Sequence, residues 1–334
     1  MTTLASAPRP AYRLDCHVAP GNRATSIAGD VRSGLGRTPR SLSPKYFYDE
    51  RGCDLFEQIT RLPEYYQTRT ELAILRDVAP GLIARHAPSE LIELGSGSST
   101  KTSALLDPMA DEGFLRRYVP FDIAPEALLA AAARVAGDYP GLEIHAVAGD
   151  FGIHLDRIPT PTEDRRLVAF LGGTIGNFRP AERHAFLREV RGLLSPGDLV
   201  LIGTDLVGDV RRTEAAYNDS RGITAAFNRN VLRVVNGELG GNFVPANFEH
   251  VARFEAEPAW IEMRLRAMSR QYVRLEALEM DIEIAAGEEI LTEISAKFTR
   301  DQVAQMYAES GFALSEWHTD SDRRFAVSVA TAVD

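Results

Sequence analysis

One short apolar run that ends in glycines restricts most strongly what this chain can fold into. Residues 91–99 read Leu-Ile-Glu-Leu-Gly-Ser-Gly-Ser-Ser, and the Thr-Lys-Thr that follows predicts the start of a helix. A strand that stops at Gly-x-Gly lets the backbone approach a ligand, and free N–H groups of the next helix can bind a carboxylate or a phosphate. Ser98 and Ser99 replace the third glycine of the dinucleotide fingerprint, so the motif alone leaves an ordinary glycine turn equally open.

Strands and helices alternate from this run onward. The predicted strands are nearly continuous apolar runs, which is typical of strands buried on both faces. They cover residues 91–94, 118–122, 143–148, 166–171 and 199–203, with predicted helices from about residue 100, over 125–136 and over 180–194. A helix near 300–310 and two closely linked strands, 312–317 and 325–329, end the chain. This pattern predicts an α/β fold whose doubly wound parallel sheet is closed by a terminal antiparallel hairpin.

A different pattern interrupts the alternation after Asp205. It contains a predicted helix over 222–235 and two predicted strands, 278–284 and 289–298, joined by a turn at Gly287. We therefore expect a second, α+β domain. The predicted division is a flexible tail over 1–20, a sheet domain over 70–205 and 297–334, and a second domain over 21–69 and 206–296.

Composition and charge argue against several classes of protein. The net charge is −10 without a basic stripe, which argues against nucleic acid as a partner. No apolar run approaches the roughly 20 residues of a membrane span, and the scattered histidines lack metal-ligand spacing, so we expect neither a membrane segment nor a metal site. Cys16 and Cys53 form no disulfide framework, and the first residues lack the apolar core of a signal peptide, which predicts a cytoplasmic protein.

Four successive predicted strands end in glycine or acidic residues, at Gly95, Asp122, Asp150 and the run 172–177. In a doubly wound sheet, ligands bind at the carboxyl ends of the strands. Asp122 stands where an acid can accept both ribose hydroxyls, and Asp150 where an acid can accept from an adenine amine. Each acid alone is more typical of a turn or a helix cap. Together the four strand ends predict a cofactor that contains adenosine.

Two such cofactors compete. A nicotinamide dinucleotide prefers a third glycine for its pyrophosphate, and this chain has serine there. S-adenosylmethionine has no phosphate, and a parallel core with a terminal hairpin is typical of the methyltransferases that use it. The residues therefore favour methyl transfer, and a nicotinamide-dependent dehydrogenase stays as an alternative.

Five longer runs resemble one family. They are 62–71 (Leu-Pro-Glu-Tyr-Tyr-Gln-Thr-Arg-Thr-Glu), 93–97 (Glu-Leu-Gly-Ser-Gly), 172–177 (Gly-Gly-Thr-Ile-Gly-Asn), 224–230 (Thr-Ala-Ala-Phe-Asn-Arg-Asn) and 287–295 (Gly-Glu-Glu-Ile-Leu-Thr-Glu-Ile-Ser). From about residue 28 the chain is similar to the L-histidine Nα-methyltransferases of ergothioneine biosynthesis. The resemblance implies a Rossmann-like class I methyltransferase core with a substrate-binding α+β domain. It also implies transfer of three methyl groups from S-adenosyl-L-methionine to the α-amine of L-histidine, which gives hercynine.

The resemblance further implies which residues bind the two small molecules. For the cofactor, the matching positions are Gly95, Lys101, Asp122, Asp150, Phe151 and Gly172. For histidine they are Asn177 and Tyr217 at the carboxylate, Tyr65, Glu293 and Ser295 around the imidazole, Met263 and Phe56 beside the substrate, and Tyr48 near the amine. The sequence departs mildly from the family pattern at Gln67, Gly173 and Ala296. No catalytic base is assigned, because a sulfonium nearby already favours the neutral amine.

Several alternatives stay open at this point. Glu293 can be a solvated residue of its strand, although it shares a face with Leu291 and Ser295, as a pocket wall would. Met263 lies between Ile261 and Leu265 at period two, so it can simply be core. The acceptor can be another aromatic amino acid such as tryptophan, and the protein can be a metabolite-binding protein without catalysis. We expect a monomer, because no exposed apolar heptad stands out.

Overall fold

A mostly parallel sheet forms one half of the molecule. The computed structural model describes residues 12–18, 20–97, 99, 101–160 and 165–334. The strand order is β1-β5-β4-β3-β6-β7-β14-β13, and only β14 and β13 run antiparallel to their neighbours. The strands are β1 (Tyr12–Cys16), β3 (Glu90–Leu94), β4 (Arg117–Asp122), β5 (Glu143–Ala148), β6 (Arg166–Phe170), β7 (Leu199–Asp205), β13 (Phe312–Thr319) and β14 (Phe325–Ala332). The predicted α/β fold, a parallel core closed by a terminal antiparallel hairpin, is thereby confirmed.

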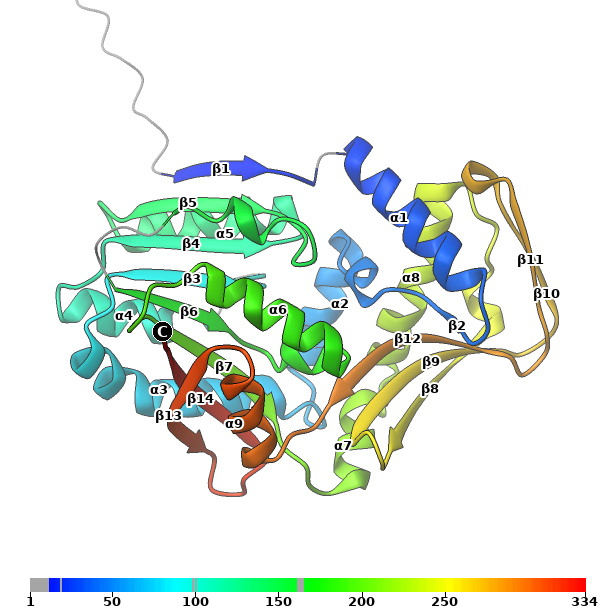
Figure 1. Cartoon of the computed structure of the whole chain (residues 1–334). Coiled ribbons are helices and arrows are strands. Elements are labelled where there is room, and N and C mark those ends of the chain that lie inside the picture. Colours follow the sequence, from blue (N-terminus) through cyan, green and yellow to red (C-terminus); the bar gives the residue numbers. More distant parts are fainter. Residues whose placement is uncertain (1–11, 19, 98, 100, 161–164) are drawn as a thin grey trace, which may run out of the picture.

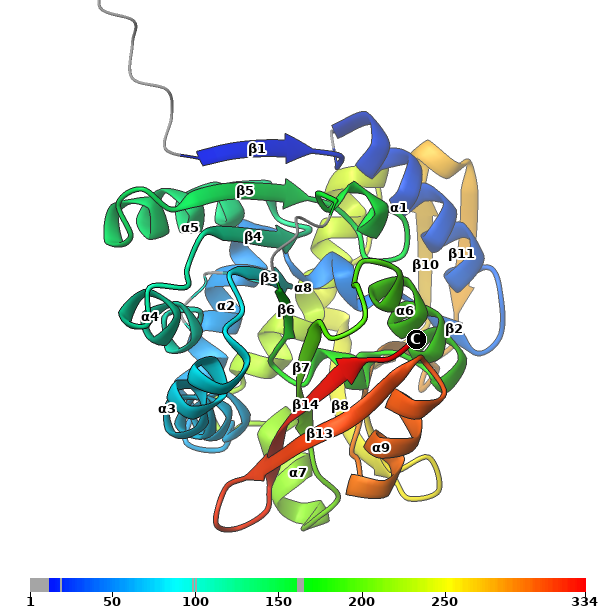
Figure 2. The same cartoon turned by 60° about the vertical axis from the view of Figure 1, so that its left-hand side comes forward.

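Helices cover both faces of this sheet (Figures 1 and 2). One face packs against α3 (Gln67–His86), α4 (Ser103–Asp111) and α5 (Pro125–Asp138), and the other against α6 (Pro180–Gly192) and α9 (Arg300–Ala308). Neighbouring residues of one strand supply opposite faces: Leu91 belongs to the first cluster and Ile92 to the second, and both are fully buried. This two-sided burial is the physical reason for the continuous apolar strands in the sequence.

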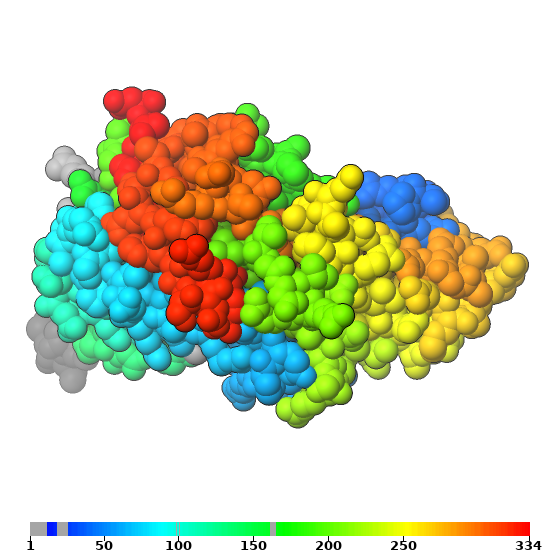
Figure 3. All heavy atoms as spheres, turned by 90° about the horizontal axis from the view of Figure 1, so that it is seen from below, coloured from blue at the N-terminus to red at the C-terminus, as the bar shows by residue number. Residues whose placement is uncertain are grey.

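A second, smaller sheet forms the other half of the molecule. Its strand order is β2-β12-β9-β8, from β2 (Arg40–Ser41), β12 (Glu289–Ala296), β9 (Trp260–Ala267) and β8 (Phe248–Glu255). Helices α1 (Pro20–Leu35), α2 (Glu50–Thr60), α7 (Val210–Tyr217) and α8 (Ile223–Leu239) accompany it, and β10 (Gln271–Leu275) and β11 (Met280–Ile284) form a separate ribbon. Seen from below, this half carries the yellow and orange segments at one end of the molecule (Figure 3).

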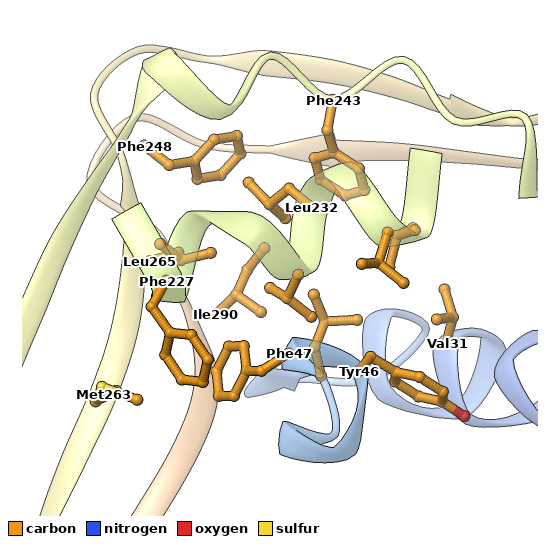
Figure 4. Close-up of a cluster of buried hydrophobic side chains, with 14 of the residues drawn as sticks. Val31, Tyr46, Phe47, Phe227, Leu232, Phe243, Phe248, Met263, Leu265 and Ile290 are labelled. Carbon is orange, nitrogen blue, oxygen red and sulfur yellow. The ribbon is translucent and has the colours of Figure 1, made fainter. Parts of the chain in front are cut away.

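The core of this second half joins two distant parts of the sequence. Val31, Tyr46 and Phe47 from the N-terminal part pack with Phe227 and Leu265 from the later part (Figure 4). The rings of Phe47 and Phe227 lie 4.7 Å apart between centroids. Burial of such apolar surface stabilises the fold, so neither part can be removed without exposing the other.

The later part leaves and re-enters the large sheet at one place. Leu206 and Phe298 form a parallel bridge, and the Phe298 N–H donates to the Asp205 carbonyl at 2.9 Å. The last residue of β7 is therefore next to the first residues after β12.

Two sequence expectations are wrong. Residues 12–16 of the expected flexible tail form β1, which pairs in parallel with β5, whereas residues 1–11 lie outside the described residues. The strands near 278–284 and 289–298 do not pair with each other: β11 pairs with β10, and β12 pairs with β9. The turn at Gly287 suggested a hairpin, but β9 and β10, which sequence analysis missed, are the actual antiparallel partners.

Candidate active site

One large cavity lies where the two halves meet. Its volume is about 920 Å³, and residues from both sheets line it. All fourteen predicted site residues are among them: Tyr48, Phe56, Tyr65, Gly95, Lys101, Asp122, Asp150, Phe151, Gly172, Asn177, Tyr217, Met263, Glu293 and Ser295. The structure thus brings together residues from strand ends, loops, helices and strands that are far apart in the sequence.

Two glycines form the edge of the cavity on the side of the large sheet. Gly95 and Gly172 have φ angles of +70° and +81°, in the left-handed region that favours glycine. A Cβ atom at Gly172 would meet the Lys101 ammonium at 3.6 Å, and one at Gly95 would meet the Phe151 ring at 3.4 Å. Both positions therefore let the backbone approach a ligand closely. Ser98, at the place of the missing third glycine, lies outside the described residues.

Lys101 is held by a residue that sequence analysis missed. Its ammonium forms an ion pair with Glu71, which is fully buried and also accepts from the Gly172 N–H at 2.8 Å. Helix α3 begins at Gln67 and has no side-chain cap, so Glu71 does not serve to cap it. Glu71 instead fixes the Gly172 turn and Lys101 together at the floor of the cavity.

Asp122 is positioned by the backbone of the glycine loop. Its carboxylate accepts from the Gly97 N–H at 2.7 Å and from the Ala124 N–H at 3.0 Å. Burial raises the pKa of this carboxyl, and these backbone hydrogen bonds oppose that rise. Because each carboxylate oxygen has more than one acceptor position, Asp122 can still accept ribose hydroxyls from the cavity side. The strand end therefore fits an adenosine group.

Asp150 already has partners. It accepts from Lys45 at 2.7 Å and from the Gly152 N–H at 2.9 Å. Lys45 also pairs with Asp30 at 2.8 Å, so the ion pair links the second half of the molecule to the end of β5. Burial disfavours the charge of Lys45, but its hydrogen bonds to Asp150 and Asp30 outweigh burial and raise its pKa. Sequence analysis did not identify Lys45.

Aromatic rings form the opposite wall. The Phe56 ring contacts Tyr48, Tyr65 and Phe227 with centroids 5.8, 6.1 and 5.9 Å apart, and Tyr65 lies 6.5 Å from Tyr217. Burial raises the pKa values of the Tyr48, Tyr65 and Tyr217 hydroxyls well above their ordinary value, so all three are neutral near pH 7. Phe227 also lines the cavity, and only its place in the run 224–230 pointed to it.

Glu293 faces the same cavity from β12. It is only 8% exposed, and among the described residues none donates a hydrogen bond to its carboxylate. Burial raises its pKa from 4.5 to about 8, and the charge of Lys297 partly opposes this rise. A buried carboxyl group without a partner is costly for the folded protein unless a ligand supplies one.

Ser295 and Tyr217 belong to a buried polar network. The Tyr217 hydroxyl donates to Ser295 Oγ at 2.7 Å, and the Lys297 ammonium donates to both oxygens, at 3.1 and 3.0 Å. Lys297 also pairs with Asp205 at 2.9 Å. Sequence analysis missed Lys297 and Asp205, although Glu293, Ser295 and Lys297 continue one alternation along the strand.

Asn177 and Met263 complete the cavity lining. Asn177 ends a 3₁₀ turn, Thr174–Asn177. The turn packs so closely on β12 that a Cβ atom at Gly176 would lie only 2.9 Å from the Ala296 carbonyl oxygen. Met263 is 2% exposed and lies opposite Glu293 in the β9–β12 register. It therefore belongs to the core and also lines the cavity.

Two further findings concern metals and membranes. In the part of the chain that the structure describes, no group of three or more His, Cys, Asp or Glu side chains could hold a metal ion. Within that same part, no helix is both long and apolar enough to span a bilayer.

Comparisons with known proteins agree with this geometry. A family model described as "Histidine-specific methyltransferase, SAM-dependent" matches residues 27–332. The histidine N-alpha-methyltransferase of Mycolicibacterium smegmatis is 50% identical over 94% of this chain and 97% of its own length, and that of Mycobacterium tuberculosis is 49% identical over 91% and 94%. The ergothioneine biosynthesis protein 1 of Neurospora crassa is 32% identical over 89% of this chain and 34% of its own length. With its parallel core, its glycine-edged cavity and this match along nearly its whole length, the chain belongs to the histidine-specific, S-adenosylmethionine-dependent methyltransferase family.

Proposed function

We propose that this protein methylates the α-amine of L-histidine three times and so produces hercynine, the first step of ergothioneine biosynthesis. One observation carries the proposal: a buried carboxyl group without a partner, Glu293, faces the same cavity as the glycine edge and Asp122. A ring N–H is the partner that this group lacks, and the fold provides a methyl-donor site within the same space.

The glycine edge and the strand ends hold the cofactor. S-adenosylmethionine supplies an electrophilic methyl group when bound. Asp122 accepts the ribose hydroxyls, while Phe151 and Asp150 flank the adenine. Gly95, Gly172 and Lys101 surround the methionine end, where the Lys101 ammonium is available to a carboxylate. This assignment is supported by the backbone bonds that fix Asp122 and by the left-handed backbone of both glycines at the edge of the cavity.

The second half holds the amino acid. Glu293 and Ser295 address the imidazole, with Tyr65 beside it. Asn177 and Tyr217 lie at the carboxylate, Tyr48 lies near the amine, and Phe56 and Met263 close the remaining wall. The lining of one cavity by all eight side chains supports this placement. An indole has no acceptor nitrogen to match a hydroxyl donor, so tryptophan is a poorer fit.

The reaction needs positioning more than acid–base chemistry. The sulfonium leaves as a neutral thioether, so a correctly aligned amine needs little further activation. The three tyrosines of the aromatic wall are held protonated, so none serves as a tyrosinate base at neutral pH. Their faces, with Phe56, can stabilise the permanent cation of the trimethylated product by about 0.5–2 kcal/mol per ring.

A small-molecule acceptor agrees with an enclosed cavity of this size. We further propose that the protein is a cytoplasmic monomer without nucleic-acid or membrane partners. Its net charge of −10 and its two free cysteines support this proposal.

Incubation of the purified protein with S-adenosylmethionine and histidine tests the function. Mass spectrometry should show products that carry one, two and finally three added methyl groups, with tryptophan unchanged in a parallel reaction. Cofactor binding without any methylated product would favour a metabolite-binding protein instead. Reduction of a nicotinamide dinucleotide would favour a dehydrogenase.

A further inference from the structure

A buried lysine, Lys297, lies next to Ser295, one of the two residues assigned to the imidazole. Lys297 is 2% exposed, and its ammonium has three partners: Asp205 at 2.9 Å, Ser295 Oγ at 3.0 Å and Tyr217 Oη at 3.1 Å. An ammonium has three protons and accepts nothing, so these contacts use its full capacity. Asp205 is held in turn by the Tyr66 hydroxyl and the Gln67 amide, at 2.8 and 3.2 Å. The lysine therefore has one well-defined place.

The hydrogen-bond directions around Ser295 follow from this arrangement. A hydroxyl group accepts two hydrogen bonds and donates one. Ser295 Oγ accepts from Lys297 and from the Tyr217 hydroxyl, which leaves it only its own proton to offer. Ser295 lines the cavity, so this proton is available to a ligand. Glu293, two residues earlier, is the neighbouring group that can accept.

We propose that Lys297 acts as a positioning residue that makes Ser295 a hydrogen-bond donor, so that the site reads the neutral imidazole ring. One ring nitrogen donates its N–H to Glu293, and the other, unprotonated nitrogen accepts from Ser295. This inference rests on the proposed function and adds a selection among protonation states of the ring. A ring that carries only an N–H leaves the Ser295 proton without a partner, and such buried mismatches are penalised strongly.

A competing arrangement uses the same atoms. If the Tyr217 proton turns to the substrate carboxylate, Ser295 can donate to Tyr217 and accept from the ring. Glu293 and Ser295 would then both accept, and the site would read the charged imidazolium. The direction of the Tyr217–Ser295 hydrogen bond favours the first arrangement.

Amino acids with altered rings separate these arrangements. Titration calorimetry in the presence of S-adenosylhomocysteine, which cannot donate a methyl group, compares histidine with the two isomers of pyrrolylalanine. Each isomer has one ring N–H and no acceptor nitrogen. We expect the wild type to prefer histidine over the better isomer by at least about tenfold. In Lys297→Met this preference should shrink by about tenfold, because Ser295 can then accept as well as donate.

Matched variants keep this test informative. Lys297→Met/Asp205→Asn removes the pair without leaving Asp205 as an unpaired buried charge, and Ser295→Ala removes the donor while Lys297 stays. Thermal unfolding reports whether each variant folds. Both should lose the preference for histidine over pyrrolylalanine and keep their affinity for S-adenosylhomocysteine.

Three results would overturn this inference. If Lys297→Met weakened histidine and pyrrolylalanine by the same factor, the lysine would only support the fold, and the inference would be overturned. Equal wild-type affinity for histidine and pyrrolylalanine would also overturn it, because no acceptor nitrogen would then be read. A wild type that bound none of these amino acids would instead overturn the proposed function, and the inference with it.

Discussion

The two sides of the cavity treat their charged groups differently. On the side of the large sheet, three carboxylates are already bound: Asp122 by two backbone N–H groups, Asp150 by Lys45 and Glu71 by Lys101. On the side of β12, Glu293 has no hydrogen-bond donor among the described residues. The first side is thus already held in its binding geometry, whereas on the second side the Glu293 carboxyl lacks a hydrogen-bond donor that only a suitable ligand supplies. The difference assigns general binding to the first side and selectivity to the second.

Removal of the Glu293 carboxyl group should have the largest effect on ligand binding. We expect Glu293→Ala to weaken histidine binding by about 100-fold, because the ring N–H loses its buried hydrogen-bond acceptor. Affinity for S-adenosylmethionine should stay within twofold, as roughly expected for sites that share no partner. Titration calorimetry with each ligand measures both. Glu293→Gln serves as the control for shape, and an equal loss of both ligands would contradict the division between the two sides.

The same group should make stability depend on pH. Its pKa is about 8 in the folded protein against an ordinary value of 4.5, so the folded state holds the proton more tightly. The resulting stabilisation is complete below pH 4.5 and is lost as the pH rises through 8. Relative to Glu293→Gln, the ligand-free wild type should lose on the order of 2 kcal/mol of unfolding free energy between pH 5 and pH 8.5.

Urea unfolding at a series of pH values measures this difference. If the unfolding free energies of wild type and Glu293→Gln changed with pH in the same way, the Glu293 carboxyl would not be buried in solution. Saturating histidine should reduce the difference, because the ring supplies the missing donor.

On the side of the large sheet, we expect a smaller effect, and it should weaken the cofactor more than histidine. Asp122→Ala should weaken S-adenosylmethionine by about tenfold, since the ribose loses an acceptor and the glycine loop loses its anchor. Histidine affinity should change less. Asp122→Asn separates the two causes, because the amide oxygen can still accept from the Gly97 N–H. Unchanged cofactor affinity in Asp122→Ala would refute the ribose assignment.

The smallest effect should come from the contact between the two sides. In Lys45→Met, Asp150 loses a partner and is free to accept from the adenine amine, so cofactor affinity should rise by about threefold. The effect is small because a partly exposed ion pair contributes only about 0–1 kcal/mol. Arg61→Met, which breaks an exposed pair with Glu57, is the matched control. A fall in cofactor affinity would mean that Lys45 itself supports the adenine.

The sequence revealed the two sides to different degrees. Five of the six parallel strands could be located, because burial on both faces produces apolar runs that need no partner to be recognised. The exception is β1, which lies at the edge of the sheet, is only partly buried and was expected to belong to the tail. The second sheet could be located only in part: β12 was predicted, whereas β8, a strand with one exposed face, mixes polar and apolar residues irregularly and was missed. The wrong pairing of β11 with β12 followed from a local turn that tertiary contacts override.

The site shows the same limit. Glu293 and Ser295 could be predicted from a family pattern, and their alternation placed them on one face. Lys297 and Asp205 carry no motif, and only the fold shows that they meet at 2.9 Å. Lys45 was equally invisible, because its partners Asp30 and Asp150 lie on different halves of the molecule.

The bridge between Leu206 and Phe298 has a consequence for how such enzymes can change. A segment that begins and finishes at neighbouring points of a scaffold can be lengthened, trimmed or replaced with little disturbance to that scaffold. Evolution can therefore retain the methyl-donating machinery while it tries new acceptors on the inserted segment. Because that segment shares its core with residues 27–66, a successful graft has to carry both pieces together.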